Sequence, residues 1–203
     1  MSKLSEQKKS IIIVPGLAES AAHFKKLKQL LEKNDFAVII VPSWNTGQLT
    51  PQSADLFIGH SLGANLVLHK KLAPALIVGT ADGSKVRKNV IRSLLAADMD
   101  ALRKKRIFRH IWHRINNAWT IIFNFQKFLK LARTYKNIDF FHYKPDSSIV
   151  IIQNTEDYIV QTTDYARTQP GTHEDFVLFP EKYMTCIKEL SELPQHRRKG
   201  TRI

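Results

Sequence analysis

Short, continuous runs of apolar residues recur along the chain, and most of them are closed by proline or glycine. The run Ser10–Val14 is rich in β-branched residues and is followed directly by Pro15 and Gly16. A short apolar run without polar alternation is typical of a strand in a parallel sheet, where both faces are covered. The other runs of this kind are 36–41, 55–58, 75–79 and 149–153.

Segments with helical spacing separate these runs. Apolar residues recur at intervals of three and four over 20–33, 61–72 and 181–193, which is typical of helices with one buried face. Strands that alternate with helices indicate a doubly wound α/β fold with a mostly parallel sheet, here of about five or six strands. Ligands bind such sheets at the carboxyl ends of the strands.

Composition narrows the class of protein further. A chain of 203 residues, 43% of them hydrophobic, suits one globular domain, which we expect to span 1–203. The single cysteine, Cys186, excludes an internal disulfide, and no Cys/His cluster has the spacing of a zinc site, so we expect no metal. A polar N-terminus leads into an apolar run too short for a signal peptide, so we expect a cytoplasmic protein.

The net charge of +13 is unevenly distributed. Residues 101–136 contain ten Lys or Arg and no Asp or Glu, and a second basic cluster lies in the tail, 194–203. Residues 84–136 are helical by periodicity and rich in aromatics, and they form an insertion between the fourth and fifth strands. Such charge is compatible with an anionic membrane surface, an anionic substrate or a uniformly basic proteome. Nothing else in the chain is typical of a nucleic-acid module, so we expect no nucleic-acid partner.

The most specific motif is Gly59-His60-Ser61-Leu62-Gly63, which fits G-x-S-x-G. A predicted strand precedes it and a predicted helix follows it, which is the context that a nucleophile elbow requires. The glycines relieve steric conflict around a serine held on a tight turn. Ser61 Oγ would then project above the sheet, and the N–H of Leu62 would face a developing oxyanion.

These residues resemble the α/β-hydrolase superfamily, of which the chain would be a small, reduced member. The resemblance implies a second oxyanion donor in the Leu17 amide, after Pro15-Gly16. It also implies the order serine, acid, histidine, which assigns Asp157 as the acid and His173 as the base. Glu156 and Asp82 remain alternative acids. Only fifteen residues separate Asp157 from His173, which leaves little room for the usual helix and strand.

The resemblance implies a serine hydrolase that cleaves a carboxylic ester or thioester through an acyl-enzyme, without a cofactor. An amidase or peptidase with the same residues, and a catalytically silent protein that binds a ligand or partner, are the alternatives. The insertion would be a cap that binds an acyl chain or contacts an anionic lipid surface. The alternative is a structural scaffold whose aromatic side chains pack on the core. The aromatics of the proposed acyl pocket are Phe108, Trp112, Trp119 and Phe123.

Overall fold

A computed structural model of the chain describes most of the predicted sheet and its helices. The described residues are 8–16, 19–79, 108, 111–112, 115, 118–119, 122–127, 129, 147–155, 157 and 166–193. The tail predicted over 194–203 and most of the insertion predicted over 84–136 lie outside them.

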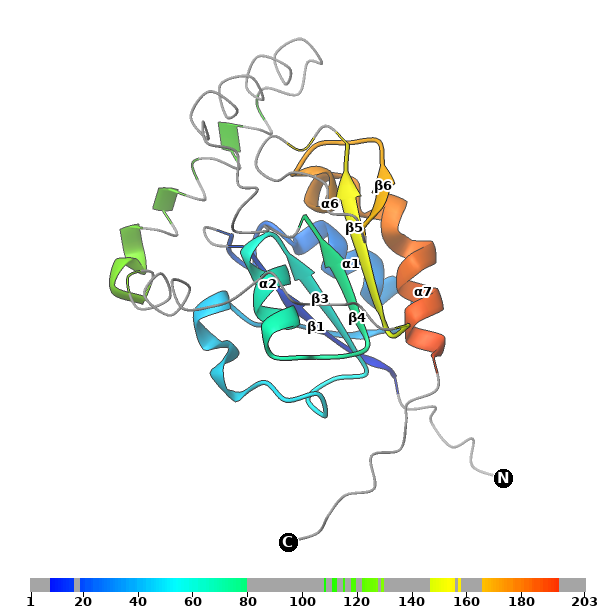
Figure 1. The fold of residues 1–203 in the computed structure, drawn as a ribbon. Coiled ribbons are helices and arrows are strands. Elements are labelled where there is room, and N and C mark those ends of the chain that lie inside the picture. Colours follow the sequence, from blue (N-terminus) through cyan, green and yellow to red (C-terminus); the bar gives the residue numbers. More distant parts are fainter. Residues whose placement is uncertain are drawn as a thin grey trace, which may run out of the picture.

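Six parallel strands form one sheet in the order β2-β1-β3-β4-β5-β6 (Figure 1). The strands are β1 Ser10–Val14, β2 Ala37–Ile40, β3 Leu56–His60, β4 Ala75–Val78, β5 Ile149–Asn154 and β6 Arg167–Gln169. The helices are α1 Lys25–Lys33, η1 Ser43–Gln48, α2 Leu62–His69, α6 Asp175–Leu178, η2 Pro180–Tyr183 and α7 Met184–Glu192. The predicted doubly wound α/β fold is therefore confirmed.

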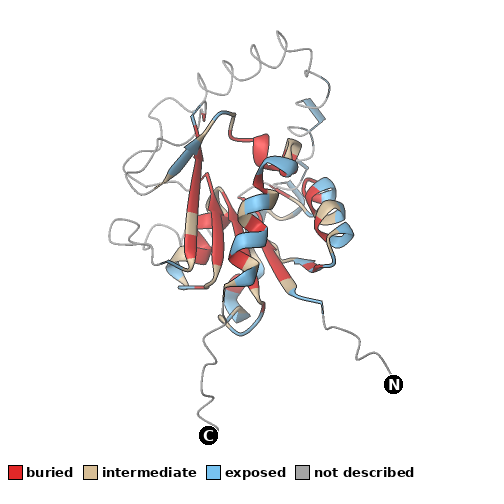
Figure 2. Ribbon diagram, turned by 90° about the vertical axis from the view of Figure 1, so that its right-hand side faces the viewer, coloured by how far each residue is buried: buried red, intermediate tan, exposed pale blue. Residues whose placement is uncertain are grey.

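The four central strands, β1, β3, β4 and β5, are apolar on both faces because helices cover both sides of the sheet. Ile11 and Ile13 of β1 belong to a cluster with Phe24 and Leu27 on the side of α1 and α7. The alternate residues of β1 pack on the opposite side, together with Ala64 and Val67 of α2. Figure 2 shows the buried strands in the middle and the exposed outer surfaces of the helices around them.

Two helices, one connection and the last strand differ from the predictions. The helix predicted over 20–33 begins only at Lys25, and the helix predicted over 181–193 is divided into η2 and α7. A short 3-10 helix, η1, lies between the predicted strands 36–41 and 55–58, where no helix is predicted. β6 has no predicted counterpart, because its three residues, Arg-Thr-Gln, carry no apolar pattern at this edge of the sheet.

The chain order of the strands positions the candidate site. The chain leaves β1 toward β2 on one side and then returns to β3 on the other side of β1, so the connections diverge between β1 and β3. Doubly wound sheets bind their ligands at such a switch point, beyond the carboxyl ends of the strands. Pro15 and Gly16 follow β1 and Ser61 follows β3, so both segments lie at this point.

The described residues of the insertion are nearly all helical, as its periodicity predicts. Within the described part of the chain, no helix combines the length and the apolarity needed to cross a bilayer.

Candidate active site

Ser61 occupies a strained backbone conformation between β3 and α2. Its φ is 51° and its ψ is −121°, in a region that residues other than glycine rarely adopt. The Ser61 N–H donates to the carbonyl oxygen of Val78 in β4 at 2.9 Å, which fixes the turn against the neighbouring strand. This is the geometry that the G-x-S-x-G motif predicts.

The two glycines of the motif are required by close packing of backbone on backbone. A Cβ on Gly59 would lie 2.6 Å from the Cα of Ala64, and a Cβ on Gly63 would overlap the carbonyl oxygens of Val14 and Pro15. Any side chain at either position would push α2 away from β1 and β3. The glycines therefore allow the first turn of α2 to lie directly on the end of β1.

The segment after β1 lies beside the serine. A Cβ on Gly16 would be 2.9 Å from Ser61 Cβ, so the two backbones are in close approach. The buried hydroxyl of Ser43 donates to the carbonyl oxygen of Pro15 and, at 3.3 Å, to that of Gly16. Of the two predicted oxyanion donors, Leu62 is the first residue of α2, while Leu17 lies outside the described residues.

His173 and Asp157, the predicted base and acid, form a buried pair. His173 Nδ1 lies 2.8 Å from Asp157 Oδ2, and the same carboxylate oxygen accepts a hydrogen bond from Gln153 Nε2 at 3.0 Å. The side chains of His173 and Asp157 are only 7% and 2% exposed. The structure thus brings these two predicted residues together. Asp82 and Glu156, the alternative acids, lie outside the described residues.

The pair lies against the end of β4, next to the strand that carries the serine. A Cβ on Gly79, which follows β4, would lie 3.1 Å from His173 Cε1 and 3.6 Å from Asp157 Oδ2. Gly79 has a φ of 62° and follows Val78, whose carbonyl accepts the Ser61 N–H. The turn at Ser61 and the Asp157–His173 pair therefore both lie at the carboxyl ends of the strands.

The segment before His173 is tied to β5. Asn154, the last residue of β5, donates through Nδ2 to the carbonyl oxygen of Thr172 at 2.5 Å. The Thr172 hydroxyl donates in turn to Asp175 Oδ1 at 2.8 Å. These bonds fix the chain on both sides of the imidazole.

The environment of His173 favours the charged imidazolium. Burial alone would lower the pKa of His173, but the charge of Asp157 and the hydrogen bond to it outweigh burial and raise the pKa to about 9. The charges of Glu174 and Glu19 add to this increase in the pKa. An imidazole with Nδ1 held by a carboxylate directs Nε2 toward a substrate or nucleophile.

Two further residues of the site have no counterpart in the sequence-based predictions. His60 lies within the elbow motif, but the motif assigns it no role. Its Nε2 lies 3.1 Å from the carbonyl oxygen of His173 and its Nδ1 lies 2.8 Å from Glu19 Oε2. Glu19 carries no motif that could have identified it.

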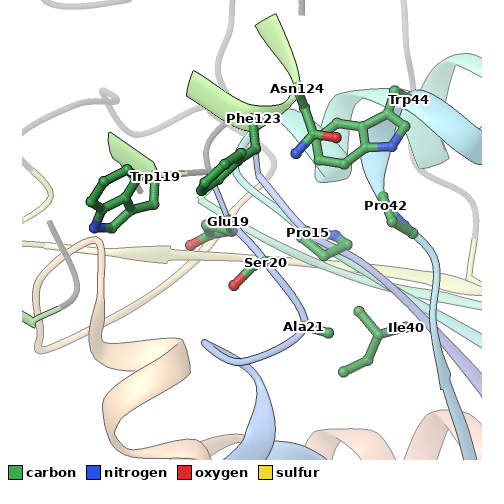
Figure 3. A pocket seen from close by; sticks show the side chains of 10 residues that line it. All are labelled: Pro15, Glu19, Ser20, Ala21, Ile40, Pro42, Trp44, Trp119, Phe123 and Asn124. Carbon is green, nitrogen blue, oxygen red and sulfur yellow. The ribbon is translucent and has the colours of Figure 1, made fainter. Parts of the chain in front are cut away.

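An open cavity of about 280 Å³ adjoins the segment after β1 (Figure 3). Trp119 and Phe123 of the insertion face Pro15 and Glu19 across it. The remaining lining residues are Ser20, Ala21, Ile40, Pro42, Trp44 and Asn124. Lys127 Nζ lies 5.8 Å from the centre of the Trp44 ring, a cation–π contact between the insertion and η1. Among the described residues, no group of His, Cys, Asp and Glu could hold a metal ion.

Two solved structures resemble this fold over most of its length. A variant of YbtT, the type II thioesterase of the yersiniabactin pathway, has a TM-score of 0.52 and 14% identity, and the match covers 91% of this chain and 93% of that one. An N-formylmaleamic acid deformylase from Pseudomonas putida has a TM-score of 0.50 and 12% identity, with coverage of 89% and 92%. The chain therefore has an α/β-hydrolase-like fold. No protein-family model and no curated protein sequence matches it.

The raised pKa of His173 gives a first testable prediction. Titration followed by NMR should show the imidazole losing its proton near pH 9. In Asp157→Asn the pKa should fall below 6.5, the ordinary value, because burial then dominates. The folded-state pKa exceeds the unfolded one, so the stabilisation, on the order of 3 kcal/mol, is complete below pH 6.5 and is lost as pH rises through 9. An unchanged pKa in Asp157→Asn would contradict the role of this carboxylate.

Proposed function

We propose that this protein is a serine hydrolase that cleaves a carboxylic ester or thioester through an acyl-enzyme. Ser61 is the nucleophile, His173 the general base, and Asp157 the carboxylate that orients His173. One observation carries the proposal. A serine with a φ of 51° on a strand-to-helix turn and a buried carboxylate–imidazole pair both lie at the carboxyl ends of the parallel strands. Strain at the serine and burial of two ionisable groups are both costly, and such costs concentrate at catalytic sites.

The acylation step follows from the arrangement of these groups. Ser61 Oγ attacks the substrate carbonyl carbon while His173 Nε2 accepts the hydroxyl proton. This step uses the neutral imidazole, which is the minor form below the pKa of about 9, so acylation should quicken as pH rises toward 9. The carbonyl π electrons move to oxygen and give a tetrahedral oxyanion. Collapse of this intermediate breaks the bond to the alcohol or thiol, which leaves with the proton from His173. Asp157 stabilises the imidazolium between the two transfers.

Backbone amides would stabilise the oxyanion. The Leu62 N–H lies at the start of α2, where the helix dipole favours negative charge. The resemblance to α/β-hydrolases assigns the second donor to Leu17. Deacylation repeats the chemistry with water: His173 accepts a proton from water, hydroxide adds to the acyl carbon, and Ser61 leaves with the proton.

The two similar structures support the class of reaction. One is a thioesterase and the other a deformylase, so the thioester is a credible substrate and amide cleavage is the alternative. At 12% and 14% identity these likenesses concern the fold, and the assignment depends on the site itself.

The cavity beside Gly16 is the proposed acyl site. Pro15 and Glu19, which line it, flank the glycine that approaches Ser61. Trp119 and Phe123 provide the aromatic wall predicted for an acyl pocket. Phe108 and Trp112 do not line this cavity, and their exposed fractions are 87% and 64%. Of the four predicted aromatics, Trp119 and Phe123 therefore line the cavity, whereas Phe108 and Trp112 lie on an outer surface of the insertion.

That outer surface is the proposed contact with an anionic membrane. Apart from the two pocket residues, large hydrophobic residues are exposed along the described insertion at helical spacing, namely Phe108, Ile111, Trp112, Ile115 and Ile122. Ten Lys or Arg and no acidic residue accompany them over 101–136. An exposed apolar helix face with positive charge suits an anionic lipid interface.

A fluorophosphonate probe tests the nucleophile. We expect labelling of the wild-type protein and none in Ser61→Ala, and we expect both Ser61→Ala and His173→Ala to lower kcat by roughly 10⁴–10⁶. A panel of ester, thioester and amide with one acyl group identifies the bond cleaved. A folded wild-type protein that neither labels nor hydrolyses any of them would support the silent binding protein instead.

The acyl site predicts a dependence on chain length. Lengthening a test ester from two to eight carbons should raise kcat/KM, by up to about fourfold per buried methylene at roughly 0.8 kcal/mol each. Trp119→Ala and Phe123→Ala should reduce this gain at least tenfold for the eight-carbon ester. Trp112→Ala is the matched control and should retain the gain. A preference for the two-carbon ester in the wild-type protein would contradict the acyl site.

The membrane contact predicts salt-sensitive vesicle binding. The protein should sediment with vesicles that contain phosphatidylserine and dissociate as salt rises, because exposed charges are screened beyond about 8 Å at physiological ionic strength. The double variant Phe108→Ser/Trp112→Ser should bind at least tenfold less tightly. Ile39→Ser, which removes an exposed isoleucine outside the insertion, is the control. Equal binding by both variants would overturn this contact.

A further inference from the structure

A second carboxylate–imidazole pair is buried beside the proposed catalytic one. Glu19 Oε2 lies 2.8 Å from His60 Nδ1, and the His60 side chain is 0% exposed and the Glu19 side chain 8%. Neither residue has a role in the proton transfers described above. Burying two ionisable groups away from water is costly, and apolar residues at the same positions are often equally stable or more stable. The pair therefore calls for a role other than stability.

Hydrogen bonds at its two ends connect different parts of the site. The Gly16 N–H donates to Glu19 Oε2 at 2.5 Å, so the carboxylate holds the segment beside Ser61. At the other end His60 Nε2 lies 3.1 Å from the carbonyl oxygen of His173. A carbonyl oxygen only accepts, so Nε2 carries a proton and donates it. The chain of contacts runs from Gly16 through Glu19 and His60 to the backbone of His173.

Packing leaves the imidazole of His60 little freedom to rotate. Its ring stacks on Phe176 at a centroid distance of 5.5 Å and lies 4.9 Å from the ring of His173. Phe24 approaches it from a third side with its ring edge, at 6.0 Å. The ring therefore acts as a rigid spacer, and a change at Glu19 is transmitted to His173 rather than absorbed by rotation.

We propose that Glu19 and His60 are a positioning pair that holds the Gly16 segment and the His173 backbone in register with Ser61. The inference rests on the proposed function, because register matters only where Ser61, His173 and the oxyanion donors act together. The pair acts through its neighbours: His60 through the His173 backbone, and Glu19, which also borders the cavity, through the Gly16 N–H. A displacement on the order of 1 Å at such a site costs about 100-fold in rate.

Single substitutions should separate the two ends of the pair. Glu19→Ala removes the acceptor of the Gly16 N–H and should lower kcat about 100-fold. Because Glu19 also borders the cavity, KM is compared for the two-carbon ester, for which it should change less than threefold. His60→Phe keeps the ring but loses both hydrogen bonds, and should lower kcat to a similar extent. Glu19→Gln keeps an acceptor for Gly16 but no carboxylate for His60, so its kcat should lie between Glu19→Ala and the wild type.

The double variant Glu19→Ala/His60→Phe distinguishes positioning from stability. It removes both ionisable groups of the pair, so its thermal stability should exceed that of His60→Phe, in which the buried Glu19 carboxylate keeps the Gly16 N–H but loses its imidazole partner. Its kcat should stay about 100-fold low, no lower than in either single variant, because the two residues act as a unit. A double variant that regains the wild-type kcat with its stability would overturn the proposal.

Asp55→Ala is the matched control. Asp55 Oδ2 accepts the Ser10 N–H at 2.6 Å, at the amino ends of β1 and β3. The variant therefore loses a hydrogen bond between a carboxylate and the backbone that is remote from Ser61. It should lose stability but keep kcat within about twofold. If Asp55→Ala and Glu19→Ala lower kcat equally, the effect is general destabilisation and the proposal fails.

The failure of this role can be distinguished from the failure of the proposed function. A wild-type protein without labelling or turnover would contradict both. An active wild type with an equally active Glu19→Ala would contradict this role alone.

Discussion

The contact between the first turn of α2 and the end of β1 is the constraint on which the site depends. Gly63 meets the carbonyl oxygens of Val14 and Pro15 with no room for a Cβ, and Gly59 meets Ala64 in the same way. Between these two contacts the chain turns at Ser61 with a φ of 51°, and this turn lets α2 begin this close to the sheet. The strain at the serine is therefore a result of helix–sheet packing.

The other components of the site lie around this turn. Gly16 fits beside Ser61 because it too lacks a Cβ, and Gly79 leaves space for the imidazole of His173. The ends of β1 and β4 therefore contribute a glycine each, and the end of β3 contributes Ser61. Segments that are distant in sequence converge because the parallel strands all end on the same side of the sheet. The proposed nucleophile, Ser61, would be held there among fixed dipoles.

The fold could be predicted from sequence where a local pattern carried the information. β1 and β4 are continuous apolar runs, and Ser61 lies in a motif whose flanking strand and helix are also local. His173 and Asp157 could be ranked by chain order, although their contact at 2.8 Å depends on packing that no pattern records. Their catalytic roles remain predictions.

The same reasoning explains what sequence alone could not supply. β6 consists of three polar or charged residues, and its strand character comes from pairing with the end of β5. Glu19 and His60 lie 41 positions apart and have no shared motif. Their partnership exists only because the β1 and β3 ends are neighbours in the sheet. Long-range polar contacts of this kind become visible only in three dimensions.

The 3-10 helix η1 also determines which parts of the chain are free to vary. It replaces a full crossover helix between β2 and β3, so this side of the cavity is bordered by Ile40, Pro42 and Trp44, while the facing side comes from the insertion. Neither segment carries Ser61, His173 or Asp157. Mutation and insertion can thus remodel the cavity while the reactive groups stay fixed. Evolution could change what such a protein accepts without rebuilding what it does.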